Sequence, residues 1–441
     1  MSLSPNTAPA AGGGPIVLVE SSRALPLASL TVSLRTGAIE DPVGKEGLTR
    51  LCARLMRRTA GGLAPHLVDT RIDSLGAGLG PEVGHSIAAF HGTVIARSLD
   101  PLVDLLEDML ARPGLDDGEL ARLVRETQAE IVEARDNDRS LARRWFRRKL
   151  FGDHAYARSV TGSLRSVQAI SAADVRAQVR QLFVSGNLVF AFAGDLDEAA
   201  AERIARRVRD ALPDGAARED GAGEPSARSG RHLVLVDKPE RTQTQILIGG
   251  LGTHPKDPDH LPLSVATTIF GGTFTARMTR EVRSKRGWSY GAYASVPFDR
   301  HRQAFSMWTF PKAEDAAPCI ELELAMLHDW RERGVTRAEL TWAKRYLTRS
   351  HAFSIDTAGK RVGLELDALL YGLPPDYYAR YVERVQAVTL EQVNEAIQKR
   401  ISERDLLVVV VGTEAVIGEP VRRVIPDLEG VEIVPYDSDA Y

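Results

Sequence analysis

An internal repeat constrains the fold of this chain more than any other feature of its sequence. In the first half, a Val-Gln-Ala-Ile segment precedes a serine-capped helical pattern and an apolar strand that ends at Gly194. In the second half, a Val-Gln-Ala-Val segment precedes a threonine-capped helical pattern and an apolar strand that ends at Gly412. Val175 and Val393 keep the same offset of 218 residues as the two glycines. Because cap, helix and strand recur in one order, the halves are predicted to be homologous domains.

A change of composition marks the boundary between the halves. Residues 213–231 are rich in Gly, Ala, Ser, Pro and charged side chains and lack apolar periodicity, so we expect a flexible linker that buries too little surface to become ordered. The whole chain has 441 residues, more than one ordinary core supports. The predicted organisation is a flexible lead-in at residues 1–14, an N-terminal domain at 15–212, the linker, and a C-terminal domain at 232–441.

Each half begins with apolar, strand-like runs and continues with long helical patterns. The strand-like runs lie at residues 15–20 and 28–36 in the first half and at 232–237 and 243–250 in the second. Strands and helices do not alternate strictly, so a doubly wound parallel sheet is disfavoured. The predicted fold class is α+β, with a mixed, mostly antiparallel sheet in each domain and helices packed on one face of it.

Charge and hydropathy exclude several classes of protein. The formal net charge is −3, so no overall basic field predicts nucleic-acid binding. No run of apolar residues is long enough to predict a membrane span. The first residues lack both the basic and the apolar region of a signal peptide, so we expect the cytoplasm, or the periplasm if a signal peptide has been removed.

Cysteines and histidines give no metal motif. Only two cysteines are present, Cys52 and Cys319, which excludes a disulfide framework and predicts two buried small side chains. No two of the ten histidines have the i, i+4 spacing that places two imidazoles on one helix face. His85 and His91 have the same strand parity, but six residues of strand would separate them by about 20 Å.

One strongly basic segment stands out. Residues 139–149 hold six basic side chains interleaved with Trp145 and Phe146. This pattern can bind nucleic acid or an acidic partner, but it is more typical of an amphipathic helix whose aromatic side is in the core. We expect its arginines to be solvated or paired with Asp136 and Asp138.

Four segments resemble one known family. Residues 41–48 (DPVGKEGL), 150–170 (LFGDHAYARSVTGSLRSVQAI), 187–197 (NLVFAFAGDLD) and 270–295 (FGGTFTARMTREVRSKRGWSYGAYAS) are similar to the pitrilysin (insulinase) family of zinc metallopeptidases, in its short bacterial branch. The resemblance covers most of residues 15–415, in the family's order. It implies duplicated halves that together form one half of a clamshell.

The sequence departs from the family at its zinc motif. Catalytic members carry His-x-x-Glu-His on the helix after the Gly-Leu pair, and here those positions hold Arg50, Ala53 and Arg54. The resemblance assigns the third zinc ligand to Glu130 or, less well, to Glu133. A guanidinium has no lone pair for a metal, so we expect no zinc in this chain and an arginine paired with the remaining glutamate.

A second family feature is retained. The resemblance assigns to Arg283 and Tyr290 the arginine and tyrosine that engage substrate peptide beside the zinc. Both can donate hydrogen bonds to a scissile carbonyl and to the oxyanion that develops from it. Without the resemblance, Arg283 would be interpreted as a solvated helix charge and Tyr290 as a half-buried strand aromatic.

The short branch contains subunits with the zinc motif and subunits that lack it but keep the Arg/Tyr pair. The resemblance therefore implies a non-catalytic, substrate-binding subunit of a heterodimeric zinc peptidase, with zinc held by a homologous partner that carries the motif. Peptides or small unfolded proteins are the implied substrates, and an exposed sheet edge at residues 79–84 is a possible docking strand, weakened by Pro81. The alternative is a proteolytically silent scaffold or peptide-binding pseudoenzyme, and an independent enzyme with another nucleophile or metal has no motif to support it.

Overall fold

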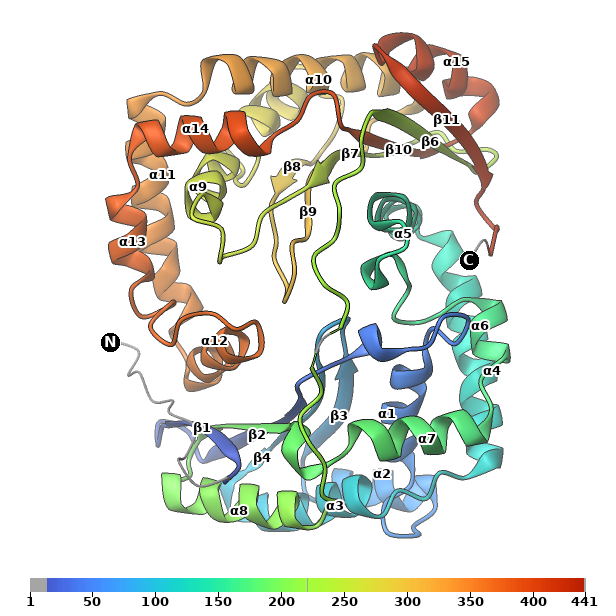
Figure 1. Cartoon of the computed structure of the whole chain (residues 1–441), viewed down its shortest axis with the longest axis vertical. Coiled ribbons are helices and arrows are strands. Elements are labelled where there is room, and N and C mark those ends of the chain that lie inside the picture. Colours follow the sequence, from blue (N-terminus) through green and yellow to red (C-terminus); the bar gives the residue numbers. More distant parts are fainter. Residues whose placement is uncertain (1–13, 220, 440–441) are drawn as a thin grey trace.

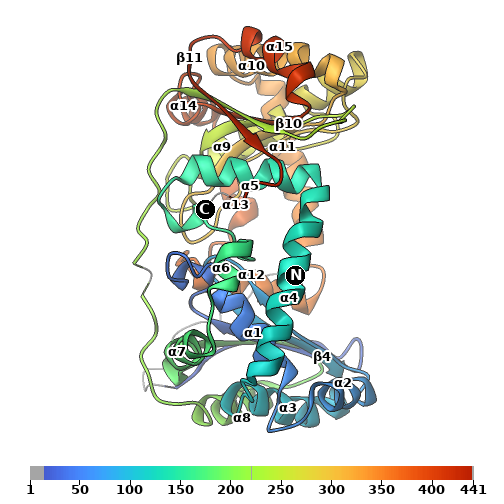
Figure 2. The ribbon, with the colours of Figure 1, turned by 90° about the vertical axis from the view of Figure 1, so that its right-hand side faces the viewer.

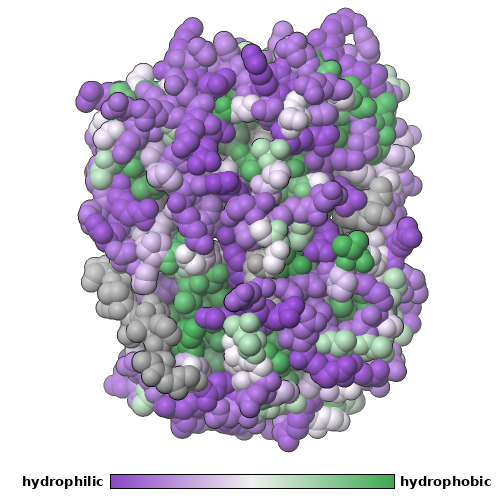
Figure 3. All heavy atoms as spheres, viewed as in Figure 1, coloured by the Kyte–Doolittle hydropathy of each residue, from purple (hydrophilic) through white to green (hydrophobic). Residues whose placement is uncertain are grey.

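The computed structural model describes residues 14–219 and 221–439 and divides them between two α+β halves, one above the other in Figure 1. The predicted lead-in at residues 1–14 falls almost entirely outside the described residues. No described helix is both long and apolar enough to cross a bilayer. Figure 3 shows a face covered mostly by hydrophilic residues, with apolar residues in separate patches.

The N-terminal half contains a five-stranded sheet in the order β1-β5-β2-β4-β3. Only β1 and β5 run parallel, and the other neighbours are antiparallel. The strands are β1 (Ile16–Ser21), β2 (Leu27–Leu34), β3 (Gly78–Val83), β4 (Ala88–Ile95) and β5 (Leu188–Gly194). The helices of this half are α1 (Leu48–Arg58), α2 (Pro65–Ser74), α3 (Leu99–Ala111), α4 (Asp117–Glu133), α5 (Asp138–Phe151), α6 (Leu164–Gln168), α7 (Ala172–Leu182) and α8 (Glu198–Asp210).

The C-terminal half repeats this order in a six-stranded sheet, β11-β6-β10-β7-β9-β8, with β11 added beyond the repeat. Its strands are β6 (Arg231–Asp237), β7 (Gln245–Leu251), β8 (Ala292–Ser295), β9 (Ala304–Thr309), β10 (Leu407–Gly412) and β11 (Leu428–Pro435). Its helices are α9 (His260–Phe270), a π-helical segment η6 (Thr279–Lys285), α10 (Ala316–Arg333), α11 (Arg337–Ser350), α12 (Ala358–Leu370), α13 (Tyr381–Ala387), α14 (Leu390–Arg400) and α15 (Glu414–Val424).

The predicted fold class is confirmed, and the repeat appears in the topology. The apolar strands β5 and β10, which the repeat aligned, occupy equivalent places between one parallel and one antiparallel neighbour. Both strands are buried along nearly their whole length, because each sheet is covered on both faces at this point.

The second face of each sheet is covered by a helix from the other half. Helix α5 packs against β7 and β10 of the C-terminal sheet, and helix α12 packs against β1 and β5 of the N-terminal sheet. Figure 2 shows α5 directly beneath the C-terminal sheet. Trp145 and Phe146 are buried in this contact, as predicted, beside strand residues such as Val409. This exchange of helices joins the halves into one body.

The arginines of the basic segment were expected to be solvated or paired with Asp136 and Asp138; Arg139 and Arg143 are exposed, as expected, but Asp138 has other partners. Asp138 pairs with Lys238 at 2.7 Å and with Arg241 at 3.4 Å, both in the other half. Lys149, near the end of α5, pairs with Glu432 at 2.7 Å. Because α5 packs on the C-terminal sheet, Asp138 and Lys149 pair with residues of the C-terminal half.

The expectation of an unordered linker is also wrong for the described part of residues 213–231, which runs along one side of the molecule in Figure 2. The Gly186 amide donates to the Gly215 carbonyl at 3.0 Å, and Arg218 pairs with Glu40 at 2.9 Å. Arg228 donates to the Lys149 carbonyl at 3.0 Å. Hydrogen bonds from the backbone and from arginine side chains hold this segment in place, although its sequence has no apolar periodicity.

Candidate functional site

Helix α1 carries the positions of the zinc motif and is anchored by a buried carboxylate. Asp41 accepts hydrogen bonds from the amides of Gly47 and Thr49, both at 2.8 Å, and from the Thr49 hydroxyl at 2.6 Å. Burial raises the pKa of Asp41 to about 6, and the hydrogen bonds from Thr49 and Gly47 offset part of that rise. The apolar side of the helix, which includes Leu51 and Leu55, is fully buried in the N-terminal core. The opposite side therefore faces helix α4.

Two arginines of α1 share one glutamate of α4. Arg50 Nη2 lies 2.8 Å from Glu130 Oε2, and Arg54 Nη2 lies 2.9 Å from Glu130 Oε1. Arg54 also donates to the Thr127 hydroxyl at 3.0 Å and lies 3.6 Å from Glu126. The predicted pairing of an arginine with the remaining glutamate is confirmed for both arginines.

Further ion pairs extend this arrangement along the two helices. Arg58 pairs with Glu119 at 3.0 Å and with Glu126 at 2.6 Å. Glu133, the other candidate for the third ligand, is exposed near the end of α4 and is not among the partners of Arg50 or Arg54. The turn of α4 that carries Glu130 faces the zinc-motif positions of α1.

The residues at this centre do not fit a zinc ion. Two permanently charged guanidiniums occupy both carboxylate oxygens of Glu130, and neither can donate an electron pair to a metal. Ala53, at the position of the general base, is 1% exposed and offers only a methyl group. The centre is an ion-paired contact between α1 and α4 that can neither hold zinc nor activate water.

Arg283 and Tyr290 lie together on the surface of the C-terminal half. The Arg283 guanidinium carbon is 4.2 Å from the centre of the Tyr290 ring and 4.2 Å from that of Phe274. Tyr290 is 75% exposed and Phe274 is 64% exposed, so Tyr290 does not have the half-buried position that would be expected without the family resemblance. The two rings stack on Arg283 and leave its N–H groups for an outside acceptor.

No carboxylate among the described residues pairs with Arg283. Glu281, on the same π-helical segment, accepts from Lys285 at 2.6 Å and from Arg286 at 3.0 Å. Among the residues that the structure describes, Arg283 has no hydrogen-bond acceptor for its guanidinium. The site therefore presents an uncompensated planar donor between two exposed aromatic rings.

Phe274 was missed by the sequence reasoning. It lies nine residues before Arg283, outside the π-helical segment η6 that carries the guanidinium, and the fold brings the two together. Its signal in the sequence was a phenylalanine between a Gly-Gly break and a polar helix, where an apolar side chain has no obvious core to enter.

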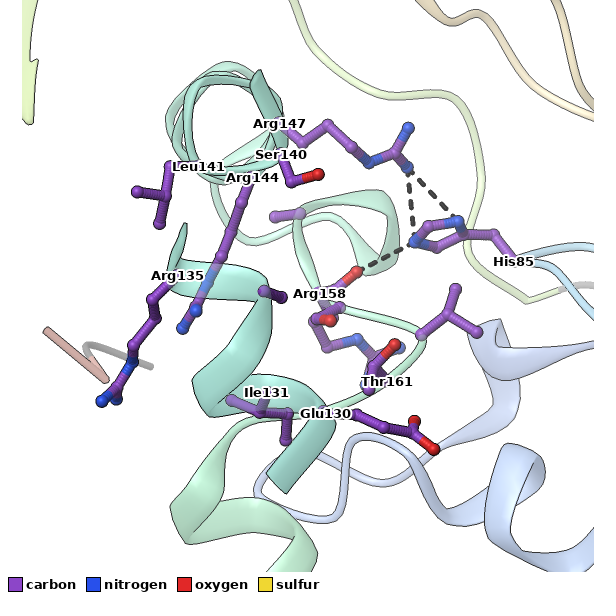
Figure 4. Close-up of a pocket in the computed structure, with 15 residues that line it drawn as sticks. His85, Glu130, Ile131, Arg135, Ser140, Leu141, Arg144, Arg147, Arg158 and Thr161 are labelled. Carbon is purple, nitrogen blue, oxygen red and sulfur yellow. Dashed lines mark hydrogen bonds between the residues drawn. The ribbon is translucent and has the colours of Figure 1, made fainter. Parts of the chain in front are cut away.

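The structure also contains a cavity of about 310 Å³ beside the ion-paired centre, which the sequence did not predict. Glu130 lines one wall, and arginines from α5 and from the segment after it line others (Figure 4). This cavity does not include Arg283 or Tyr290. No contact between the two candidate groups, Arg50 with Glu130 and Arg283 with Tyr290, occurs in the described part of the chain.

Comparisons with known proteins agree with these features. The family model of insulinase (peptidase family M16) matches residues 16–164, and that of the peptidase M16 inactive domain matches residues 169–347. A protein of Helicobacter pylori described as the non-peptidase homolog YmxG is 22% identical over 407 residues, which are 90% of this chain and 92% of that protein. An uncharacterized zinc protease of Mycobacterium bovis is 25% identical over 402 residues, 89% of this chain and 90% of the relative.

A solved structure has the same fold over nearly the whole chain. The crystal structure of a peptidase M16 inactive domain from Pseudomonas fluorescens matches with a TM-score of 0.84 and 27% identity, covering 90% of this chain and 95% of that one. Models of one family match both halves in succession, and arginines replace both zinc-binding histidines. The chain therefore belongs to the pitrilysin (insulinase, M16) family, as a non-catalytic member.

Proposed function

We propose that this chain is the substrate-binding subunit of a heterodimeric zinc peptidase and completes the active site of a homologous, zinc-bearing partner. The observation that carries the proposal is the half-buried Arg283 between the exposed rings of Phe274 and Tyr290, with no acceptor for its donors among the described residues. A surface guanidinium with no acceptor inside the chain is hydrated, and an acceptor from outside the chain can take the place of that water.

The chemistry of this pair suits a peptide bond under attack. Stacking on two rings restricts the guanidinium, so less freedom is lost when it binds an oxygen. Arg283 and the Tyr290 hydroxyl would donate to the scissile carbonyl and to the oxyanion that forms from it. The partner's zinc would supply the activated water, since the residues of this chain cannot bind the metal.

A sheet edge offers a place for the substrate backbone. Strand β3 ends the N-terminal sheet, with β4 on one side and no strand of this chain's described residues on the other. A peptide could pair with this edge as an added strand. Pro81 lies opposite Phe90 in the β3–β4 register and has no N–H, so the pairing would be interrupted at that residue.

A peptidase assay on a quenched peptide library tests the proposal. The chain would be assayed alone and mixed with a homologue from the same genome that carries His-x-x-Glu-His, each with and without a chelator. Activity only in the mixture, abolished by chelation, is the expected result. If the mixture has no peptidase activity and the two chains do not associate, the scaffold or peptide-binding pseudoenzyme is favoured instead.

Variants of the mixture then separate catalysis from assembly. Arg283→Ala should lower kcat/KM about a hundredfold, the usual order for loss of one oxyanion donor, and Tyr290→Phe should lower it as well. Arg280→Ala is the matched control, because Arg280 lies on the same segment, is largely exposed and, among the described carboxylates, approaches only Glu281, at 3.9 Å. Equal turnover by the Arg283 and Arg280 variants would contradict the assigned role.

A further inference from the structure

Helix α11, at the left of the C-terminal half in Figure 1, has one side in the core and the other in solvent. Leu340 and Ala343 are buried in the C-terminal core, and the helix also contacts α9 and α13. The opposite side carries two aromatic and two basic side chains, all exposed: Trp342, Arg345, Tyr346 and Arg349. Their spacing of three and four residues places them next to one another on the helix surface, which we call the α11 face.

The cations of α11 are not neutralised by the rest of the described chain. The arginines of the α11 face pair with no carboxylate among the residues described, and neither does Arg337 at the start of the helix. Lys344 donates to the Gln386 carbonyl at 2.7 Å, which carries no charge. The one carboxylate within the helix sequence, Glu339, is bonded by Arg277 at 2.7 Å. Helix α11 therefore presents four cations that an anion from outside the chain can reach.

The two aromatic rings of the α11 face form a fixed apolar surface beside these cations. Trp342 is 37% exposed and Tyr346 is 43% exposed, and their rings stack with centroids 5.6 Å apart at an angle of 12°. Neither the Trp342 indole N–H nor the Tyr346 hydroxyl has a hydrogen-bond partner in the described part of the chain. Phe353, just beyond the end of α11, is 74% exposed. Exposed aromatic rings next to arginines are typical of the residues that contribute most to binding at protein interfaces.

The α11 face lies on a segment next to the Arg283 site. Arg277 donates to both carboxylate oxygens of Glu339, each at 2.7 Å. Phe274 precedes Arg277 by three residues, and Trp342 follows Glu339 by three residues. This ion pair therefore joins the segment that carries Phe274 to the first turn of α11. Both places combine arginines that lack a carboxylate partner among the described residues with exposed aromatic rings.

We propose that the α11 face binds an acidic peptide segment that also carries apolar side chains. Peptide carboxylates would accept charge-assisted hydrogen bonds from Arg345 and Arg349, and apolar side chains would pack on Trp342 and Tyr346. The two arginines are one turn apart, about 6 Å along the helix, and alternate side chains of an extended peptide are about 7 Å apart. Two carboxylates on alternate residues therefore match the two guanidiniums. This binding goes beyond the proposed catalytic role and needs no zinc-bearing partner.

The charge of the whole chain favours a peptide over nucleic acid. The formal net charge is −3, so the surface outside α11 repels a long polyanion such as nucleic acid. A short peptide with a few carboxylates interacts mainly with the local cations of the helix. Four cations also offer few contacts for phosphates, which supply most of the affinity for nucleic acid.

Fluorescence polarisation with the full chain alone tests the α11 face. The probe is a labelled peptide that contains glutamates and phenylalanines, and two matched probes carry glutamines or lysines in place of the glutamates. The glutamate probe should bind about tenfold more tightly than the glutamine probe, and added salt should weaken its binding. A single-stranded oligothymidylate with the same label tests nucleic acid as the alternative ligand.

Variants of the chain locate the binding. Arg345→Ala with Arg349→Ala should weaken binding of the glutamate probe about tenfold, the order for loss of two exposed charge contacts. The matched control is Arg203→Ala with Arg206→Ala, which removes two exposed arginines from α8 in the other half and should leave binding unchanged. Trp342→Ala should also weaken binding, and Trp342→Phe should retain more of it, because a ring remains.

Reversal of the charges separates recognition from a loss of structure. Arg345→Glu with Arg349→Glu should bind the lysine probe more tightly than the wild type does, a gain that an unfolded chain would not give. Equal binding of the glutamate and glutamine probes, equal affinity of the α11 and α8 variants, or no such gain would overturn the proposal. Tighter binding of the oligothymidylate than of the glutamate probe would overturn the assignment to a peptide. Because no partner is present, these outcomes do not depend on the proposed peptidase activity.

Discussion

Replacing Glu130 with glutamine tests the ion-paired centre where the family otherwise holds zinc. The substitution keeps the shape of the side chain and removes the charge that Arg50 and Arg54 share. If that charge holds α1 against α4, the free energy of unfolding must fall. If the centre is only a vestige of a lost zinc site, the free energy should hardly change.

The magnitude follows from the geometry and the exposure. The two contacts are 2.8 and 2.9 Å long, and the side chains are 22–38% exposed. Exposed ion pairs contribute about 0.2–1 kcal/mol and well-buried hydrogen bonds to charges about 1.5–3 kcal/mol, so each contact here is worth about 1 kcal/mol. Arg54 keeps Thr127 and Glu126 as partners, which reduces its loss. We expect a total of about 1.5 kcal/mol, or a fall in Tm of about 3–6 °C for a half of this size.

Urea unfolding followed by far-UV circular dichroism measures this change. Glu133→Gln is the matched control, since Glu133 lies on the same helix, is exposed and pairs with neither arginine. The difference between the two variants should shrink at high salt, because the affected charges are partly exposed. Equal stability of both variants, or a more stable Glu130→Gln protein, would refute the reasoning and mean that desolvation of the three charges cancels their attraction.

Three further results are expected. Burial raises the pKa of Glu323 from 4.5 to about 8, so between these pH values the native chain retains a proton that the unfolded chain releases. The free energy of unfolding should therefore fall as pH rises from about 4.5 to 8. Measurements of Tm across this range should show the fall in the wild type and a smaller fall in Glu323→Gln. Trp145→Ala should cost about 3–5 kcal/mol in urea unfolding, because it opens a void between α5 and the opposite sheet; a loss below about 1 kcal/mol would mean that this contact does not join the halves. Burial raises the pKa of both Cys52 and Cys319, so neither thiol should react with a disulfide reagent until the chain unfolds; rapid reaction of the native protein would contradict their buried positions.

The sequence alone predicts the helices, the strands and the face on which a side chain lies, because the spacing of residues within each element determines them. The repeated cap, helix and strand predicted two sheets with β5 and β10 in equivalent places. The spacing of Arg50 and Arg54, one turn apart on α1, placed both guanidiniums on one face, and this spacing is independent of the rest of the chain. The structure adds their shared partner, Glu130, at distances that only the packing of α4 could set.

Only the tertiary structure decided what each apolar or charged face meets. The stripe of Trp145 and Phe146 predicted a buried helix face, but the same stripe fits any sheet, and the chain crossing places it on the sheet of the other half. The segment at residues 213–231 is ordered by hydrogen bonds to residues far away in sequence, which composition does not encode. The cavity beside Glu130 arises in the same way, because side chains from α4, α5 and the segment after α5 meet there. Pattern and spacing determine which face of an element is apolar or charged, whereas the partner of that face is fixed by contacts between residues distant in the chain.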